Sequence, residues 1–186
     1  QDLIFKSKKS FVVSKKKEKK LQNIFASNTI KGEIVSNSRL SNFIKLYFDL
    51  SSKSNYLTPT SDEINLEKLT LGKFSSILNL KKVNDIRYIN KFFETANKIL
   101  PNSGLYLGKV VTYPHRRSAI LKKYPPVFNK IIYFIDYIFS RLLPKLPIAK
   151  NIYFYLTKGK GRVMSRAEMY GRLYSCGFEI IDEKSI

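Results

Sequence analysis

The sequence has few of the side chains that enzymes use for metal binding and nucleophilic catalysis. Its 186 residues include one cysteine, Cys176, and one histidine, His115. One cysteine cannot form an internal disulfide, and one thiol with one imidazole is too few for a typical zinc site. We therefore expect Cys176 to be a small core residue, and we expect no metal, no cofactor and no catalytic cysteine–histidine pair.

Long uninterrupted hydrophobic runs are also missing. No segment reaches the ~18 apolar residues that a membrane-spanning helix needs. The apolar runs near the N-terminus, such as Phe11 to Val13, are too short for the hydrophobic region of a secretory signal. Because Gln1 is not an initiator methionine, we expect the chain to be a fragment or a processed product.

Acidic residues are scarce relative to basic ones. The chain has 34 Lys and Arg against 14 Asp and Glu, which gives a net charge of +20. Residues 1–20 contribute +6 and residues 114–162 contribute +10, so most of the charge lies in two segments. A localised positive field predicts an anionic partner, which is a membrane surface, a nucleic acid or a phosphorylated ligand.

The middle of the chain has the pattern of an α/β layer fold. Phe74 to Leu80 and Leu105 to Val111 are short apolar runs that we interpret as buried strands. Between them, apolar residues recur at three- and four-residue steps, which predicts one buried helix face. Asn84 or Asp85 is expected to cap this helix, and the turn at residues 101–104 to end it. The apolar face consists of Ile86, Ile89, Phe92, Phe93, Ala96, Ile99 and Leu100.

The flanking segments give weaker predictions. Phe43 to Leu50 is rich in aromatic residues and isoleucine and is interpreted as a strand, and residues 51–62 as a polar loop. Residues 21–30 fit a short helix or a strand, and residues 64–71 a short helix or an edge segment.

The C-terminal segment has the clearest local signals for secondary structure. Ser165 and Glu168 have the spacing of a capping box, which predicts a helix that begins there. Gly177 fits the left-handed position after this helix, and Phe178 to Ile181 is expected to be a strand.

A basic and aromatic segment, residues 114–162, separates the second strand from this C-terminal unit. Val127 to Leu143 predicts one helix whose apolar residues extend nearly all round it, which suits either a buried helix or one at a membrane interface. His115, Arg116 and Arg117 follow a strand end, where α/β proteins often bind ligands, so they fit either a solvated loop or a phosphate-binding site. The candidate anion-binding residues are Arg116, Arg117, Lys122, Lys123, Lys130, Arg141, Lys145, Lys150, Lys158, Lys160 and Arg162, and the candidate interfacial apolar residues are Phe134, Phe139 and Phe154.

Two stretches resemble the late part of a class I S-adenosylmethionine-dependent methyltransferase. They are the helix, PNSG turn and strand LYLGKVV, and the segment SRAEMYGRLYSCGFEIIDE. The resemblance implies a methyltransferase-like (Rossmann-like) α/β fold, a layered sheet with helices that is incomplete in its N-terminal cofactor half. That family's cofactor site needs a glycine-rich turn after the first strand, but the one Gly-x-Gly here, Gly159 and Gly161, lies late in the chain. Asp49 is the candidate for the acid that holds the cofactor ribose, although an aspartate at a strand end is more often a turn cap.

A second resemblance is more specific. The stretches NDIRYINKFFE, ILKKYPPVFN, LPKLPIAKNIYFYLTKGKGRVMSRAE and GRLYSCGFEIIDE are similar to the region that precedes the catalytic domain in some bacterial exopolysaccharide sugar transferases. This resemblance implies a non-catalytic accessory domain at the cytoplasmic face of the bacterial inner membrane, with a downstream sugar-transferase catalytic domain as partner. An S-adenosylmethionine-dependent methyltransferase is the alternative, and nucleic acid is a less favoured partner because no binding motif accompanies the charge.

These patterns together predict one α/β domain over residues 1–186. Its parts are a basic N-terminal segment (residues 1–30), a strand and helix core (31–113), a basic, aromatic and Pro-broken insert (114–162), and a terminal helix and strand (163–186).

Overall fold

The protein is a mixed α/β structure built on one five-stranded sheet. A computed structural model describes residues 2–7, 34, 36–49, 52, 54–58 and 73–185. The strand order across the sheet is β2-β3-β4-β1-β5. The strands are β1 (Asp2–Ser7), β2 (Asn55–Thr58), β3 (Ser76–Lys82), β4 (Leu105–Lys109) and β5 (Phe178–Lys184).

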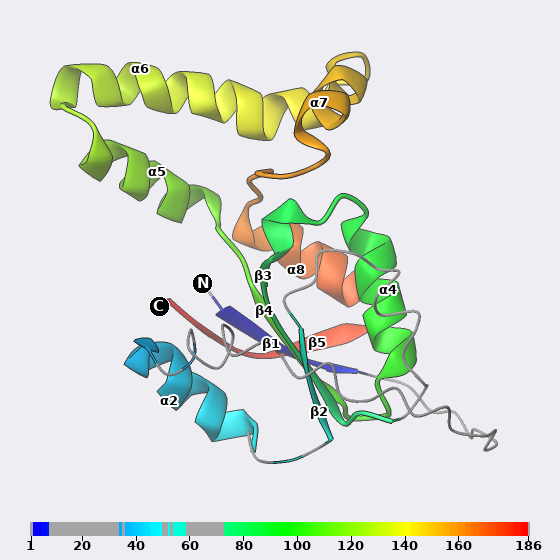
Figure 1. The fold of residues 1–186 in the computed structure, drawn as a ribbon. Helices are drawn as coiled ribbons and strands as arrows, with labels where there is room; N and C mark the ends of the chain where they lie inside the picture. Colours follow the sequence, from blue (N-terminus) through cyan, green and yellow to red (C-terminus); the bar gives the residue numbers. More distant parts are fainter. Residues whose placement is uncertain are drawn as a thin grey trace.

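The sheet has a parallel half and an antiparallel half (Figure 1). Strands β2, β3 and β4 run parallel to one another, with Leu78 of β3 paired to Leu57 and Leu107 on either side. Strand β1 runs antiparallel to both β4 and β5. The carboxyl ends of the three parallel strands therefore meet at one edge of the sheet.

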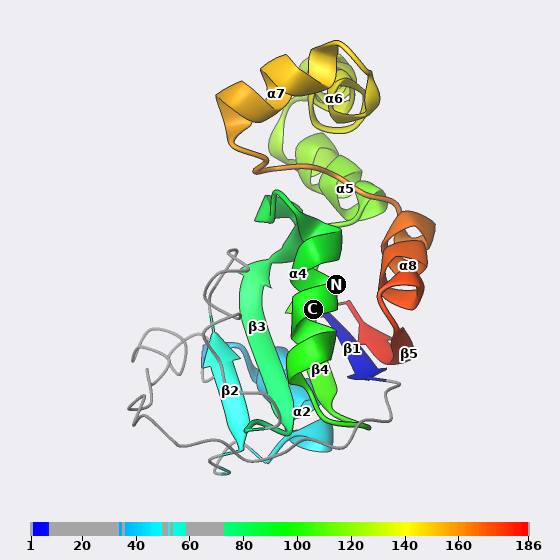
Figure 2. The ribbon, with the colours of Figure 1, turned by 90° about the vertical axis from the view of Figure 1, so that its right-hand side faces the viewer.

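Helices cover both faces of the sheet (Figure 2). Helices α4 (Ile89–Ile99) and α8 (Arg166–Ser175) lie on one face, where the larger apolar cluster includes Phe92, Phe93 and Tyr106. Helix α2 (Ser38–Tyr47) covers the other face through Leu40, Phe43 and Ile44. The α/β class is confirmed, and the layers are helix, sheet and helix.

The predicted apolar face of α4 is confirmed, but its predicted cap is wrong. All seven apolar positions of the predicted face are buried. The helix begins at Ile89 after a short 3₁₀ turn, η1 (Val83–Asp85), and no side chain caps it. The Asn84 side chain instead donates to the carbonyl oxygens of Val111 (2.8 Å) and Arg162 (2.7 Å) and accepts from the Val111 amide (2.6 Å).

Two predictions for the first third of the chain are wrong. Residues 43–47, part of the expected strand, belong to helix α2, because Leu40, Phe43 and Ile44 recur with a helical period and the side chain of Asn37 caps the helix at the Leu40 amide. The expected loop at residues 51–62 contains strand β2, which pairs with β3. The basic N-terminal segment includes β1, a strand inside the sheet. The alternatives for residues 21–30 and 64–71 lie outside the described residues.

The C-terminal unit forms as predicted. The Ser165 hydroxyl accepts a hydrogen bond from the Glu168 amide at the start of α8 (3.1 Å). Gly177 follows the helix with a φ of 81°, and an added Cβ there would lie 2.6 Å from the side-chain nitrogen Nδ2 of Asn97. Cys176 is buried, as expected for a core residue.

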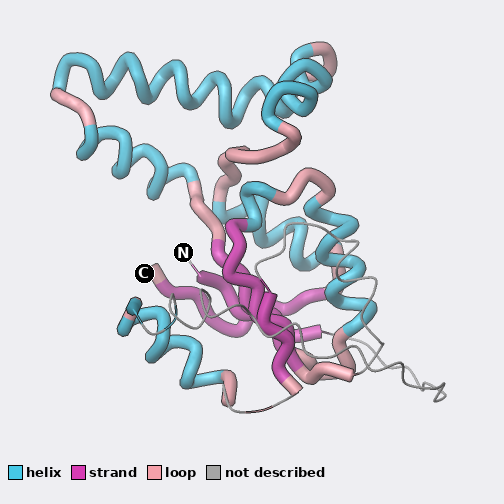
Figure 3. The backbone as a smooth tube through the Cα atoms, in the orientation of Figure 1, coloured by secondary structure: helices cyan, strands magenta, loops and turns pink. Residues whose placement is uncertain are grey.

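The basic insert is a helical lobe at the carboxyl edge of the sheet (Figures 1 and 3). It contains α5 (Tyr113–Lys123), α6 (Pro126–Tyr137), a π-helical turn η2 (Ile138–Leu142), a 3₁₀ turn η3 (Leu143–Lys145) and α7 (Ala149–Thr157). The chain leaves the sheet at Thr112 and returns at Met164, and these two residues form a parallel bridge. The expected helix over residues 127–143 thus corresponds to α6 and its continuation.

The Asn84 side chain is expected to be a major determinant of stability. Replacing it in Asn84→Ala leaves the Val111 amide and two carbonyl groups without their partner, so the free energy of unfolding should fall by about 2–4 kcal/mol. Urea unfolding of the variant measures this loss. Asn151→Ala, at an exposed position of α7, is the control and should change the free energy of unfolding by less than about 0.5 kcal/mol. Equal stability of the two variants would contradict this role of Asn84.

Candidate functional site

Helix α6 has its polar side turned toward the protein and its apolar side turned outward. Asn129 and, in η2, Ser140 are buried, whereas Phe134 on the opposite side of the helix is 63% exposed. A surface helix of a globular protein normally has the reverse arrangement, with its apolar stripe against the core. The outward apolar side of α6 therefore has no cover within the described part of the chain.

Exposed apolar side chains are concentrated in this lobe. Among the described residues, twelve of the sixteen large exposed hydrophobic side chains lie between Val127 and Leu156, with Ile148 (84%) and Tyr155 (83%) the most exposed. We call these twelve residues the outer face. Its members are Val127, Phe128, Ile131, Phe134, Ile135, Phe139, Leu142, Leu146, Ile148, Ile152, Tyr155 and Leu156. Concentrated exposure of this kind marks an interaction surface more often than scattered single residues do.

The inner side of the lobe is held by tyrosines and arginines. The rings of Tyr113, Tyr133 and Tyr137 lie within 6.3 Å of one another, and the Arg141 guanidinium lies 4.8 Å from the Tyr113 ring centre. The hydroxyl groups of Tyr133 and Tyr113 are hydrogen-bonded. Burial and this bond raise the pKa of Tyr133 to about 12. These contacts hold α6 against the start of α5, so the inner side of α6 is packed while the outer face stays exposed.

The structure divides the eleven candidate basic residues into two groups. Six of them contact protein groups: Arg116 pairs with Asp136, Lys145 pairs with Glu168, Arg162 donates to backbone carbonyls, and Arg117, Arg141 and Lys123 lie over tyrosine rings. The other five are exposed lysines with no ion pair to a described residue. They are Lys122, Lys130, Lys150, Lys158 and Lys160. The second group is the one available to an external anion.

The three candidate interfacial phenylalanines also differ. Phe134 and Phe139 belong to the outer face, with 63% and 45% of their surfaces exposed. Phe154 is half-buried, and the guanidinium groups of Arg87 and Arg162 lie 5.8 Å and 5.4 Å from its ring centre. Phe154 thus packs at the base of the lobe, on the side away from the exposed surface.

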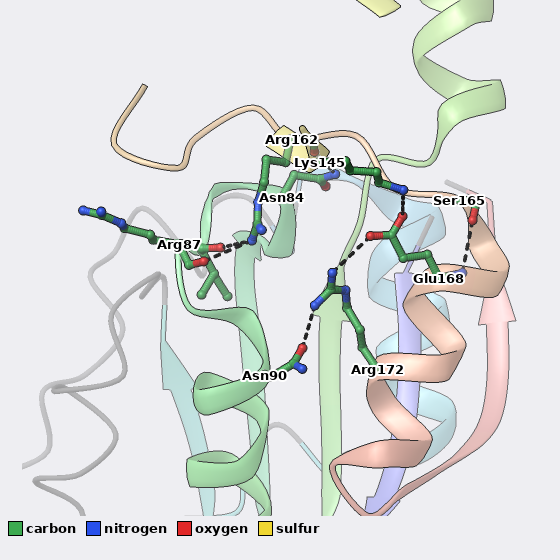
Figure 4. Close-up of polar contacts among 9 residues, drawn as sticks. Asn84, Arg87, Asn90, Lys145, Arg162, Ser165, Glu168 and Arg172 are labelled. Atoms are coloured by element: carbon green, nitrogen blue, oxygen red, sulfur yellow. Dashed lines mark hydrogen bonds and ion pairs between the residues drawn. The ribbon is translucent and has the colours of Figure 1, made fainter. Parts of the chain in front are cut away.

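An ionic network joins the lobe to α8 and α4 (Figure 4). Glu168 of α8 accepts from Lys145 of the lobe (2.9 Å) and from Arg172 (3.1 Å), and Arg172 donates to Asn90 of α4 (2.7 Å). Burial acts to raise the pKa of Glu168, but the hydrogen bonds from Lys145 and Arg172 outweigh burial and hold the pKa below its usual range. In a capping box the Glu168 side chain would accept from the Ser165 amide, but here it accepts from Lys145 and Arg172.

A pocket of about 680 Å³ lies between the sheet edge and the lobe. Five basic side chains and two carboxylates contribute to its lining, together with His115. The basic residues are Lys82, Lys109, Arg116, Lys123 and Arg162, and the acids are Asp85 and Asp136. The pocket is thus located where β3 and β4 end, as expected for ligand crevices of open α/β sheets.

The structure explains the two glycines of the Gly-x-Gly sequence. Gly159 and Gly161 have φ angles of 81° and 73°, and the Gly161 amide donates to the Asp85 carboxylate (2.9 Å). An added Cβ at Gly159 would lie 2.8 Å from the Arg87 side chain. The two glycines therefore seat the returning chain against η1. Asp49, the candidate ribose-binding acid, follows helix α2, so the expected strand end is wrong.

Comparisons with protein-family models, with curated proteins and with solved structures found no match. Within the described ranges, no helix combines the length and the apolar character needed to cross a membrane.

The sequence indicates a charged and aromatic segment at residues 114–162 but not the contacts that order it internally. The contacts of Asn84 with Val111 and Arg162 and those of the Tyr113 ring with Tyr133 and Tyr137 join residues that lie 20 or more positions apart. One signal was present in the sequence. Asn129, Asp136 and Ser140 recur near a helical period on one side of the predicted helix, which indicates a distinct polar face.

The network at Glu168 predicts a pH-dependent contribution to stability. A folded-state pKa below the unfolded-state value adds stability above the unfolded-state pKa, and that stability is lost as pH falls through the folded-state pKa. Glu168→Gln should therefore lower the urea midpoint at pH 7. The difference in urea midpoint between the unsubstituted protein and Glu168→Gln should shrink as pH falls below about 4, where carboxylates protonate. Glu94→Gln, at an exposed position of α4, is the control. If the urea midpoint of Glu168→Gln stays below that of the unsubstituted protein by the same amount across this pH range, the ionised Glu168 carboxylate does not contribute the predicted stability.

Proposed function

We propose that this protein is an accessory domain that docks on an anionic membrane surface through its helical lobe. The observation that carries this proposal is the inverted helix α6, whose polar side faces the protein while its apolar side is exposed. Transfer of apolar side chains from water to the acyl boundary of a bilayer contributes about 1.5–3 kcal/mol for each fully buried large residue. Partial insertion of the outer face therefore supplies a substantial driving force.

The charge of the lobe favours a lipid bilayer over an apolar protein partner. The five exposed lysines of the lobe without an ion pair or ring contact to a described residue lie within the same sequence range as the outer face or next to it, as in interfacial helices that combine apolar insertion with headgroup contacts. Each lysine near an anionic bilayer contributes about 1 kcal/mol. A second copy of this chain would bring the same positive charge to the interface, so self-association through this face is disfavoured.

The parent protein in this proposal is a bacterial sugar transferase of cell-surface polysaccharide biosynthesis. This part of the proposal is supported by the sequence resemblance of residues 84–183 to the region before the catalytic domain of such enzymes. The domain would position a downstream catalytic domain at the cytoplasmic face of the inner membrane, where lipid-linked sugars are made. The lobe, which projects from the sheet, is suited to such positioning without catalytic groups of its own.

The alternative is an S-adenosylmethionine-dependent methyltransferase with a divergent cofactor loop. The parallel strands β2, β3 and β4 and the pocket at their carboxyl ends favour a ligand-binding α/β protein in general. The cofactor itself carries a net positive charge, which matches poorly with a pocket that has five basic residues and two acids in its lining. Calorimetric titration with S-adenosylmethionine tests the alternative directly, and saturable binding would favour it.

Vesicle co-flotation is the test of membrane docking. The protein should float with vesicles that contain anionic lipid and should be released as salt rises, because exposed charge interactions are screened. The triple variant Lys130→Gln, Lys150→Gln, Lys158→Gln should reduce partitioning about 100-fold, since about 3 kcal/mol is lost. The double variant Phe134→Ser, Leu156→Ser should reduce partitioning at least tenfold, because two apolar anchors are removed.

Matched controls remove the same chemistry from the body of the domain. Leu46→Ser removes a side chain on α2 that is 71% exposed, and Lys81→Gln with Lys98→Gln removes two exposed charges from β3 and α4. These controls should float as the unsubstituted protein does. Flotation that does not depend on the lobe substitutions, or no flotation with anionic vesicles at low salt, would overturn the docking proposal.

A further inference from the structure

We propose that the pocket between the sheet edge and the lobe binds the phosphate group of an organic phosphate ester. This inference is independent of membrane docking, because the residues that line the pocket are distinct from those of the outer face. The two sets share no residue. The bound group is defined by its chemistry, which is a phosphate joined to an apolar or aromatic body.

The position of the pocket favours a ligand site. Lys82 ends β3 and Asp85 follows it, Lys109 ends β4, and His115 and Arg116 lie in the first turn of α5. Residues distant in the sequence thus converge where parallel strands end, the place where open α/β sheets bind ligands. The volume of about 680 Å³ lies within the range of small-molecule sites, about 300–1,000 Å³.

Arg162 is the most informative residue in the lining. Its guanidinium donates through one terminal nitrogen to the carbonyl oxygens of Ile86 (2.7 Å) and Arg87 (3.2 Å) (Figure 4). Its Nε is buried without a hydrogen-bond partner among the described residues, and no described carboxylate forms an ion pair with it. Burial lowers the pKa of Arg162. Arg162 is half-buried, and a partly desolvated guanidinium without a carboxylate is costly, so a bound anion would offset that cost.

The other charged groups give the pocket a defined geometry. Arg116 is held in a two-point contact with Asp136 through Nε (2.8 Å) and Nη2 (2.5 Å), so its position is fixed before any ligand arrives. Asp85 is engaged by the Gly161 amide. The two carboxylates are thus committed to protein groups, and the net field in the pocket remains positive. Planar, fixed guanidinium groups suit phosphate recognition.

Apart from Asn37 and Asn84, most of the remaining lining is apolar, which indicates a ligand with an organic body. Val110, Ile120, Tyr124, Ile132 and Val163 contribute to it. These side chains offer an apolar surface beside the cations. Inorganic phosphate would use only the cationic part, so an ester should bind more tightly than the free ion.

The test uses the single histidine of the chain as a reporter. His115 lines the pocket, and burial together with the positive charge of Arg166 lowers its pKa. ADP is the soluble probe, with adenosine, inorganic phosphate and S-adenosylmethionine as comparisons, and a short-chain phosphatidic acid is the lipid probe. A bound phosphate should raise the pKa of His115, measured by NMR titration of its ring protons, and calorimetry should give one site per chain.

Substitutions separate this site from general attraction to a basic protein. Lys82→Gln should weaken binding about tenfold, because one charged contact to the phosphate is lost. The neighbouring Lys81, exposed and outside the lining, provides the control, and Lys81→Gln should leave the affinity within twofold. Arg162→Gln should abolish binding. If Arg162→Gln does not fold, Lys82→Gln still tests the site.

ADP binding that is weakened by Lys82→Gln and not by Lys81→Gln supports the proposal with a soluble ligand. The same pattern with phosphatidic acid alone supports it with a lipid headgroup as the source. Equal losses in both lysine variants, or no response of His115 to any phosphate ester, would overturn the proposal. Vesicle flotation should be unchanged in Lys82→Gln, so failure here is distinguishable from failure of membrane docking.

Discussion

The amide side chain of Asn84 connects three segments that define the functional end of the molecule. It holds both backbone groups of Val111, just after β4, and the carbonyl of Arg162, where the chain returns from the lobe. Asn84 itself belongs to η1, which directly follows β3. One buried polar side chain therefore fixes the ends of two parallel strands relative to the lobe, and the shape of the pocket depends on that fixation.

The lobe contributes to both proposals through opposite sides of the same helices. Toward the sheet, α6 presents Asp136 and Ile132, which help to line the pocket, and Asn129, whose amide donates to the Leu121 carbonyl (3.2 Å). Away from the sheet it presents an apolar surface with no described partner. The polar contacts that would normally lie on a solvent-facing side are used internally, so the apolar side is left as the exposed one. The exposed apolar surface is a consequence of how the lobe is fastened.

Local signals predicted the parts of the fold that depend on neighbouring residues. The buried face of α4, the cap at Ser165 and the left-handed Gly177 follow from spacing within one or two helical turns. Helix α2 was misassigned because its short apolar run fits a strand as well as a helix, and β1 and β2 were missed because each is held mainly by pairing with distant strands. The pocket was beyond prediction for the same reason, since its lining comes from many separate segments.

From net charge alone, all the basic residues of the lobe would be expected to bind an external anion. In the structure, only some of them are free of contacts with described protein groups. Arginines are concentrated among the residues with protein contacts, where a planar guanidinium pairs with Asp136 or lies over a tyrosine ring. The exposed group consists entirely of lysines, whose flexible stems and strongly hydrated heads suit a diffuse anionic surface. Residue chemistry, more than the total charge, thus separates the cations that build the lobe from those available to a partner.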